Sequence, residues 1–402
     1  MITPQTLKGF RDFLPEEAMK RQYVIDIVRK TFELYGFEPL ETPAIEYLEV
    51  FTGNIGEDEH LFYKFKDQGG RDVALRYDQT VPTCRLIAQY PDKITLPFKR
   101  YQIQTVWRAE KPQKGRYREF LQCDADIFGV EKETADGETI ALSIEIFLRL
   151  GFKNPIAIIN DRELYKDIPY KAIVAVDKLG KIGEEGVLKE LIEKGYNSEN
   201  AKVLLAKVKN LAPNERIKNI LSYLTYYGLE KNVEFHPTLA RSFSYSTGPI
   251  WEIISPDFTG GSLLGGERFD SLVSRFSKQQ VSGTGFALGF DRTVLAMDEL
   301  GLFPDIKTKT KILVTVFSEE LLSDSIKITK SLRRQNIATD LYPDPTDKLD
   351  KQLKYADRKG IPYVAILGPD EVKNGTITLK NLKTKEQKTL STDSLPDALK
   401  QS

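Results

Sequence analysis

The spacing of apolar residues along the chain predicts alternating helical and extended segments. Apolar residues recur at helical spacing over Glu16–Tyr35, and Gly36 follows where such a helix would end. Apolar and polar residues alternate on both sides of a basic turn within Phe98–Gly129, which predicts an antiparallel hairpin. Further helices are predicted at Thr80–Gln89 and Asp136–Leu150, and further strands at Phe37–Pro43, Val73–Leu75 and Pro155–Ile159.

The second half of the chain changes character twice. Residues 160–230 are rich in Lys and Glu and have helical periodicity, which predicts a helical insertion between two halves of a sheet. Strands are predicted between Leu239 and about Val273, followed by a helix at Phe286–Leu300. The polar, Lys-rich segment Leu302–Lys311 predicts a domain boundary, so we expect one domain over 1–308 and another over 309–402.

Strands and helices alternate beyond this boundary, which predicts a small α/β domain. We expect it to finish with a hairpin that turns at Lys373-Asn374-Gly375, followed by a frayed tail. The fold class predicted for the whole chain is α+β, with a mainly antiparallel sheet flanked by helices.

Composition excludes several classes of protein. The 58 basic and 58 acidic residues cancel, so net charge gives no sign of a nucleic-acid partner. The only cysteines, Cys84 and Cys123, are too few for a disulfide scaffold and indicate a reducing compartment. His60 and His236 lie far apart, and neither a zinc-binding pattern nor a P-loop sequence occurs. With no apolar run of membrane-spanning length and no signal-peptide core, we expect a soluble, cytoplasmic protein without a membrane partner.

The predicted hairpin carries a concentration of positive charge. Its cationic residues surround the turn Pro-Gln-Lys-Gly and are Lys99, Arg100, Arg108, Lys111, Lys114, Arg116 and Arg118. The planar guanidinium fork binds phosphate oxygens through two hydrogen bonds and stays charged, so this loop suits a polyphosphate. A solvated basic hairpin without a ligand is the alternative.

Several segments resemble class II aminoacyl-tRNA synthetases, and the histidyl-tRNA synthetase family in particular. The hairpin is similar to motif 2 of that class through Arg108-Ala-Glu110, GRYREF (Gly115–Phe120), Gln122 and Asp126. The other similar segments, in the family's order, are KGFRDFLP (Lys8–Pro15), GFEPLETP (Gly36–Pro43, motif 1), LRYDQTVP (Leu75–Pro82) and GTGFALGFDR (Gly283–Arg292, motif 3). Together they extend from about residue 8 to about residue 300, and their order makes the resemblance far more specific than any one of them.

The resemblance implies the reaction and its substrates. Histidine is activated by ATP to histidyl-adenylate and transferred to tRNA(His), with Mg²⁺ bridging the phosphates. The implied ATP-binding residues are Arg108, Glu110, Arg116, Tyr117, Phe120 and Arg292. The implied histidine-binding residues are Asp78, Thr80, Gln122, Asp126, Arg241 and Tyr245. Arg108 and Arg241 have the implied catalytic role, at the α-phosphate and the attacking carboxylate. The metal ligands stay unknown, and Thr80 has the alternative of capping the helix that follows it.

One segment departs from the family pattern. The usual arginine-led stretch ends Gly-Leu-Asp-Tyr-Tyr-Thr-Gly, whereas this chain has LARSFSYSTG (Leu239–Gly248). Ser246 replaces the second tyrosine, which completes imidazole recognition in the family. Glu267, in GGERFD, replaces a usual glycine. Since Phe243 and Ser244 also differ, we expect a repacked wall in the specificity pocket rather than a gap filled by water, beside unchanged phosphate chemistry.

The resemblance also implies partners and leaves two alternatives. In the family the C-terminal α/β domain reads the anticodon, and motif 1 builds a dimer interface, so we expect a homodimer. One alternative is a paralogue that regulates histidine biosynthesis without charging tRNA, but such paralogues usually lack the C-terminal domain. The other is a related enzyme that activates a different amino acid.

Overall fold

The computed structural model describes residues 2–52, 60–240 and 245–400. The chain forms two compact units, one of Met1–Asp12 with Arg21–Leu302 and one of Phe13–Lys20 with Phe303–Ser402. They are described separately below. Among the described residues, no helix has both the length and the apolar character needed to cross a membrane.

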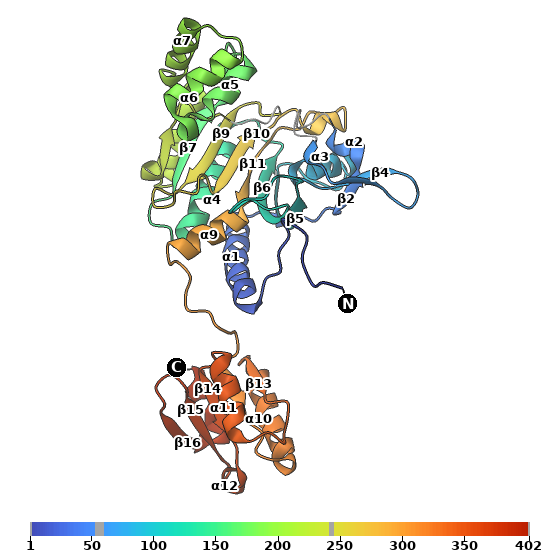
Figure 1. Cartoon of the computed structure of the whole chain (residues 1–402), viewed down its shortest axis with the longest axis vertical. Coiled ribbons are helices and arrows are strands. Elements are labelled where there is room, and N and C mark those ends of the chain that lie inside the picture. The colour runs from blue at the N-terminus through green and yellow to red at the C-terminus, as the bar shows by residue number, and fades with distance from the viewer. Residues whose placement is uncertain (1, 53–59, 241–244, 401–402) are drawn as a thin grey trace. The chain divides into compact units, whose positions relative to one another are not determined.

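An eight-stranded sheet forms the centre of the large unit (Figure 1). The strands in spatial order are β1 (Glu38–Pro39), β5 (Phe98–Trp107), β6 (Glu119–Phe128), β11 (Gly283–Gly289), β10 (Leu264–Arg268), β9 (Pro249–Ile254), β7 (Ile156–Asp161) and β8 (Val233–Phe235). All neighbours pair antiparallel except β1 with β5 and β7 with β8, at the two edges. The predicted α+β class, with a mainly antiparallel sheet, is confirmed.

The register of this sheet aligns side chains in rows across one face. Asp126 pairs with Arg100 on one side and with Gly285 on the other, and Gly285 pairs with Glu267. Because side chains alternate between faces along a strand, paired residues project to the same side. We call Arg100, Asp126, Gly285 and Glu267 the carboxylate row. The next row on this face, two residues along, consists of Gln102, Asp124, Ala287, Gly265 and Glu252.

Helices cover the opposite face. Helix α4 (Glu133–Arg149) packs against β6, β9, β10 and β11 with an almost wholly buried apolar stripe. Helix α1 (Pro15–Leu34) places Phe32 against Phe286 of β11, with ring centroids 6.1 Å apart. Helix α9 (Phe290–Glu299) contacts β6 and β11. The functional face is thus left to loops and to a small sheet of β2 (Ile45–Tyr47), β4 (Asp72–Leu75) and β3 (Lys64–Lys66), with α2 (Leu48–Phe51) and α3 (Thr80–Gln89) beside it.

The predicted helical insertion has two parts. Helices α5 (Tyr170–Val176), α6 (Leu179–Glu193) and α7 (Ser198–Lys209) share their own apolar core and form the projecting green group in Figure 1. Helix α8 (Glu215–Tyr226) instead packs on α4 and β7 through Ile217, Ile220 and Leu224. The insertion therefore connects β7 to the parallel edge strand β8, and its last helix belongs to the layer that covers the sheet.

The predicted start of the helix at Phe286 is wrong. Residues Phe286–Gly289 belong to β11, and α9 begins at Phe290. Pairing to β6 on one side and β10 on the other holds these residues extended. The predicted strand Phe37–Pro43 is also reduced to the two residues of β1, whereas α3 has the predicted limits Thr80–Gln89.

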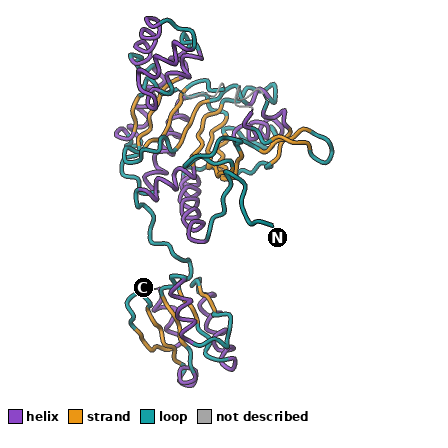
Figure 2. Tube along the Cα trace, viewed as in Figure 1, coloured by secondary structure: helices purple, strands orange, loops and turns teal. Residues whose placement is uncertain are grey.

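The small unit contains a five-stranded sheet with helices, shown in orange and purple in Figure 2. Its strand order is β13 (Thr339–Leu341), β12 (Ile312–Val314), β14 (Tyr363–Ile366), β15 (Thr376–Asn381) and β16 (Gln387–Ser391), and its long helices are α10 (Leu322–Arg334) and α11 (Leu349–Arg358). The predicted α/β domain is confirmed.

Two details of the small unit differ from prediction. A hairpin turn was expected at Lys373-Asn374-Gly375. These residues instead form the end of a short helix, α12 (Pro369–Asn374), which Gly375 terminates at φ 61°. Proline at the first helical position and a bond from the Gly368 N–H to Glu371 favour this helix over a turn. The expected frayed tail is helix α13 (Leu395–Lys400), because Leu395 and Leu399 are buried in the core of the unit.

Candidate active site

Two adjoining cavities open on the functional face of the large sheet. The first has a volume of about 190 Å³ and lies between the β5–β6 loop and the start of α9. The second, of about 180 Å³, lies above the carboxylate row. Arg108, Gln122, Gly265 and Ala287 line both cavities, so the two form one continuous site.

The basic loop is built as a tight turn. Gln113 and Arg116 exchange backbone hydrogen bonds of 3.0 and 2.9 Å around Lys114 and Gly115. Gly115 has φ 73°, a conformation that glycine adopts without strain. Arg118 donates its backbone N–H to the Gly9 carbonyl at 3.0 Å, which ties the N-terminal segment to the loop. The predicted hairpin and its turn are therefore confirmed.

The first cavity collects all the residues for which ATP binding was predicted. Those that line it are Arg108, Glu110, Arg116, Tyr117, Phe120 and Arg292. Arg108 donates from Nε to the Tyr77 carbonyl at 3.0 Å, and its guanidinium carbon lies 5.4 Å from the centre of the Phe120 ring. Arg292 donates to the Ser262 carbonyl at 2.6 Å.

The cations of this cavity are held close to one another. Burial lowers the pKa of Arg292, and the nearby charge of Arg116 lowers it further. Arg116 in turn lies 3.1 Å from a carboxylate oxygen of Glu110. Guanidinium groups stay charged even when buried, so the cavity presents fixed positive charge to a ligand. An anion would relieve the mutual repulsion of Arg116 and Arg292.

The second cavity collects the residues for which histidine binding was predicted, as far as they are described. Asp78, Thr80, Gln122, Asp126 and Tyr245 line it, and Arg241 lies outside the described residues. The N-cap residue of α3 is Gln79, so the alternative role of Thr80 as the cap is not confirmed. The roles of these residues stay predictions.

Buried acids give this cavity its chemical character. Burial raises the pKa of Asp78 to about 6, although Arg108 and the Val81 N–H both act to lower it. Burial likewise raises the pKa of Asp126, against the opposing effect of its buried ion pair with Arg100. Removing acids from water is costly unless a cation compensates for it. The cavity is thus suited to a ligand that carries positive charge.

The sequence analysis assigned no role to three acidic residues of the site, although it noted Glu267 as a departure from the family pattern. Asp124 and Glu267 line the second cavity, and Asp291 lines the first. Asp124 is buried, neither of its carboxylate oxygens has a hydrogen-bond partner among the described residues, and burial raises its pKa strongly. Alternation along β6 could have identified Asp124, because it lies between two predicted site residues, Gln122 and Asp126, on one face. Nothing in the sequence signals that Asp291 pairs with Arg11 and Arg21 at 2.7 and 2.5 Å.

The two departures from the family pattern meet in space. The hydroxyl of Ser246 donates a hydrogen bond to Oε2 of Glu267, and both side chains are buried. The predicted repacking of this wall is therefore supported at Ser246, since a carboxylate lies against the serine. Phe243 and Ser244, which also entered that prediction, lie outside the described residues.

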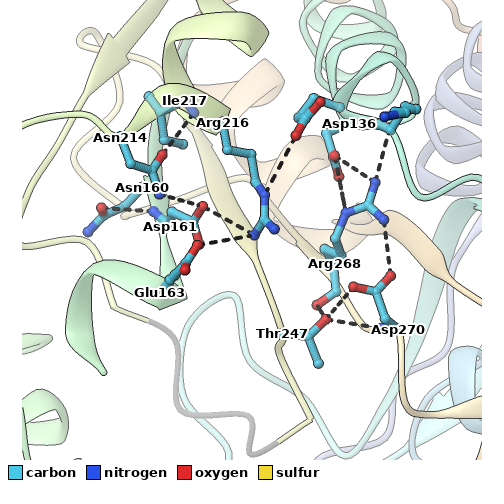
Figure 3. Close-up of polar contacts among 12 residues, drawn as sticks. Asp136, Asn160, Asp161, Glu163, Asn214, Arg216, Ile217, Thr247, Arg268 and Asp270 are labelled. Carbon is cyan, nitrogen blue, oxygen red and sulfur yellow. Dashed lines mark hydrogen bonds and ion pairs between the residues drawn. The ribbon is translucent and has the colours of Figure 1, made fainter. Parts of the chain in front are cut away.

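A polar network anchors the segment after Ser246 to strand β10 (Figure 3). Thr247 donates its backbone N–H to the Arg268 carbonyl at 2.8 Å, and its hydroxyl donates to Asp270 at 3.0 Å. The Arg268 side chain points to the other face of the sheet, where it contacts Asp136 of α4 at 2.7 Å. Ser246 and Glu267 thus lie next in sequence to Thr247 and Arg268, whose contacts join this segment to β10 and β10 to α4.

Comparisons with known proteins agree over nearly the whole chain. A family model described as histidyl-tRNA synthetase matches residues 9–182 and 157–293, and one described as an anticodon binding domain matches 311–402. The histidine–tRNA ligase of Christiangramia forsetii is 38% identical over 99% of both chains, and that of Cytophaga hutchinsonii is 38% identical over 96% of this chain and 97% of its own. The crystal structure of histidyl-tRNA synthetase from Nostoc aligns with a TM-score of 0.88 at 27% identity, covering 100% of both chains.

Proposed function

The chain belongs to the histidyl-tRNA synthetase family, and we propose that its two joined cavities hold ATP and histidine for the ligase reaction. In this reaction the histidine carboxylate attacks the α-phosphorus of ATP, pyrophosphate leaves, and the histidyl group passes to tRNA(His). One observation carries the proposal: Arg108 and Gln122 line both cavities. The two reacting groups would therefore meet where the cavities join.

In the first cavity, fixed cations would bind the phosphates of ATP. Arg108 is the candidate catalytic residue for the α-phosphate, because it lies at the junction of the cavities. Arg292, with Arg116 beside it, would bind the remaining phosphates. Phe120 would stack on adenine, with Glu110 at the base edge and Tyr117 on the wall. Charge already in place at the phosphates needs no reorganisation as the transition state forms.

In the second cavity, buried acceptors would bind the amino acid. Asp78, Thr80 and Gln122 offer a carboxylate, a hydroxyl and an amide oxygen to the ammonium group. The raised pKa of Asp78 supports this assignment, since a cation beside it would offset the cost of its burial. Asp126 and Tyr245 would contact the imidazole. Arg241 is proposed at the attacking carboxylate from the family resemblance alone.

Mg²⁺, when bound together with ATP, would supply positive charge at the phosphates. In proteins this ion is usually held by one or two carboxylates together with substrate phosphates. Glu252 fits that requirement, because it lies in the row beside Gly265, which lines both cavities. The charge of Glu252 also acts to raise the pKa of Arg292, which places the two side chains within electrostatic reach of each other.

The remaining partners are proposed on the same basis. The small unit would contact the anticodon of tRNA(His), and two copies of the chain would form a homodimer in the cytoplasm. A regulatory paralogue without charging activity is less well supported, since the anticodon-binding domain is present and the cations of the phosphate cavity are retained.

Amino-acid-dependent exchange of pyrophosphate into ATP tests the proposal. We expect exchange with histidine and Mg²⁺, and not with the other nineteen amino acids. Addition of tRNA(His) should then yield acid-stable, base-labile histidyl-tRNA. Exchange driven by another amino acid would contradict the assignment of the second cavity, and exchange without charging would favour the regulatory paralogue.

A further inference from the structure

We propose that Glu267, held in place by Ser246, determines amino-acid specificity by accepting a hydrogen bond from the substrate imidazole, opposite Asp126. The inference rests on the proposed function, because it concerns the side chain of the histidine substrate. It adds a specificity-determining residue that the sequence analysis did not assign to the site.

The sheet register places the two carboxylates on either side of Gly285. Asp126 and Glu267 both pair with Gly285, one from each neighbouring strand. Their Cα atoms are therefore roughly 10 Å apart, twice the spacing between strands. Gly285 has no side chain, and Oδ1 of Asp126 lies over it, where an added Cβ would meet this oxygen at 1.9 Å. All three residues line the second cavity, so an imidazole ring bound there would have a carboxylate acceptor on each side.

Each carboxylate is positioned by a partner on its outer side. Asp126 is paired with the buried guanidinium of Arg100, and Glu267 accepts the hydroxyl proton of Ser246. An ionised carboxylate has several acceptor positions, so it accepts from its positioning partner and from a ligand at once. The Thr247–Arg268–Asp136 network fixes the segment and the strand that carry the Ser246–Glu267 pair.

The presence of two carboxylates, Asp126 and Glu267, at one site determines which form of imidazole binds there. A neutral imidazole has one N–H donor and one nitrogen acceptor, whereas its protonated form has two N–H donors. Two facing carboxylates therefore favour a ring that donates from both nitrogens. The other titratable or charged side chains that line the cavity are Asp78, Arg108, Asp124 and Tyr245. The mutual repulsion of Asp126 and Glu267, which contributes to the raised pKa of Asp126, would be relieved by a cationic ring.

The Glu267→Gln variant tests the inference with two substrates. Glutamine keeps the volume of glutamate, and with its amide oxygen accepting from Ser246 its NH2 group faces the ring, where it donates to a ring nitrogen and cannot accept from a ring N–H. The comparison substrate is 1,2,4-triazolyl-3-alanine, whose ring stays neutral near pH 7 and is rich in acceptor nitrogens. We expect kcat/KM for histidine in pyrophosphate exchange to fall by roughly 10- to 100-fold. We also expect the preference for histidine over the triazole to fall by at least about tenfold.

The controls separate recognition from folding and from the proposed function. Glu234→Gln, an exposed position on the edge strand β8 of the same sheet, should leave both substrates unaffected. The KM for ATP and the melting temperature of Glu267→Gln should stay near those of the parent. An unchanged preference in Glu267→Gln overturns this inference alone. A parent enzyme that exchanges with another amino acid overturns the proposed function as well.

A second set of variants tests whether Ser246 and Glu267 act as a pair. Ser246→Tyr places a large ring against Glu267, and Glu267→Gly removes the acceptor, so each alone should lose on the order of tenfold or more in kcat/KM for histidine. The double variant reproduces the residue pair usual in the family and should recover most of that loss, because the tyrosine then occupies the space of the missing carboxylate. Losses that multiply in the double variant would show that the two residues act independently and would overturn the pairing.

Discussion

Replacing Asp78 with asparagine should stabilise the ligand-free enzyme at pH 8 while impairing its activity. Asp78 is 6% exposed, and burial raises its pKa from 3.8 to about 6. Between these values the folded state binds a proton that the unfolded state does not, so stability falls as the pH rises from about 4 to about 6. The full cost of the buried charge remains above that window. Since one pKa unit corresponds to about 1.4 kcal/mol, the cost is about 3 kcal/mol.

Asparagine removes this cost and keeps an acceptor for the Val81 N–H, which lies 3.3 Å from Asp78. The pKa of about 6 already includes the attraction to Arg108, whereas the cost of burying the asparagine amide offsets part of the gain, so we expect a net stabilisation of roughly 1–3 kcal/mol at pH 8. The gain should fall as the pH drops from about 6 to about 4 and vanish below pH 4, where the carboxyl group of the parent is protonated in both states. The loss of the charged acceptor should lower kcat/KM for histidine by roughly 10- to 100-fold.

Urea unfolding followed by tryptophan fluorescence measures the change in the free energy of unfolding of the large unit, which contains Asp78. Both tryptophans of the chain, Trp107 and Trp251, lie in strands of the large unit, so the signal is insensitive to the small unit. Asp72→Asn is a matched control, because Asp72 is exposed and forms a surface pair with Lys66 at 2.8 Å. Its effect should stay below about 1 kcal/mol at either pH. An Asp78→Asn variant less stable than the parent at pH 8 would refute the argument that burial of the charge dominates.

Three further substitutions probe the site and its support. Gly285→Ala would place a Cβ 1.9 Å from Oδ1 of Asp126 and 2.4 Å from the Ala125 carbonyl oxygen, so Asp126 must shift and histidine-dependent exchange should fall on the order of 100-fold with little change in the KM for ATP. Gly180→Ala, where an added Cβ meets no described atom within 4 Å, is the control. Normal exchange in Gly285→Ala would contradict the role of Asp126 in binding histidine. Asp136→Asn should reduce the stability of the large unit by roughly 3 kcal/mol in urea unfolding, because it removes the buried carboxylate of Arg268 and leaves that guanidinium with the more exposed Asp270. A loss below about 1 kcal/mol would show that the Asp136–Arg268 pair is dispensable. Arg241→Ala should lower the rate of pyrophosphate exchange on the order of 100-fold with little effect on ATP binding. Arg241→Lys should keep only part of the parent exchange rate, because an ammonium cannot reproduce the guanidinium fork. Near-normal exchange in the alanine variant would remove Arg241 from the mechanism.

The parts of the fold that were predicted correctly are those specified by local pattern. The β5–β6 hairpin alternates over ten residues in each strand, and α3 has an unbroken apolar face, so each was readable without its neighbours. The start of α9 could not be predicted from the sequence, because Phe286–Gly289 mixes apolar residues with glycine in a pattern that fits the period of a strand and that of a helix equally well. Pairing with β6 and β10 makes Phe286–Gly289 part of a strand. Pairing between segments so far apart in sequence cannot be predicted from the segment alone.

The same distinction applies to the site. The arginines and acids of the recognised motifs were found because each motif is continuous in sequence. The contact between Ser246 and Glu267 joins residues 21 positions apart, on a loop and a strand, and depends on how β10 pairs with β11. Likewise, Lys373-Asn374-Gly375 has the composition of a turn and equally that of a helix end, and Pro369 and Glu371 upstream decide between them.

The row arrangement of the sheet explains how the amino-acid pocket can differ from the family pattern without loss of the phosphate site. Ser246 and Glu267 change one end of the carboxylate row, whereas Arg108 and Arg292 lie outside it. Successive rows on one face are two residues apart along each strand, or about 7 Å. A substitution in the carboxylate row therefore alters the contacts of the amino-acid side chain directly, whereas it reaches Arg292 and Arg116 only across the residues that line both cavities, which include Arg108 and Gln122. Changes of specificity on this sheet should accordingly involve a row residue together with its contact partner, and Glu267 with Ser246 on the adjoining loop has the form of such a pair.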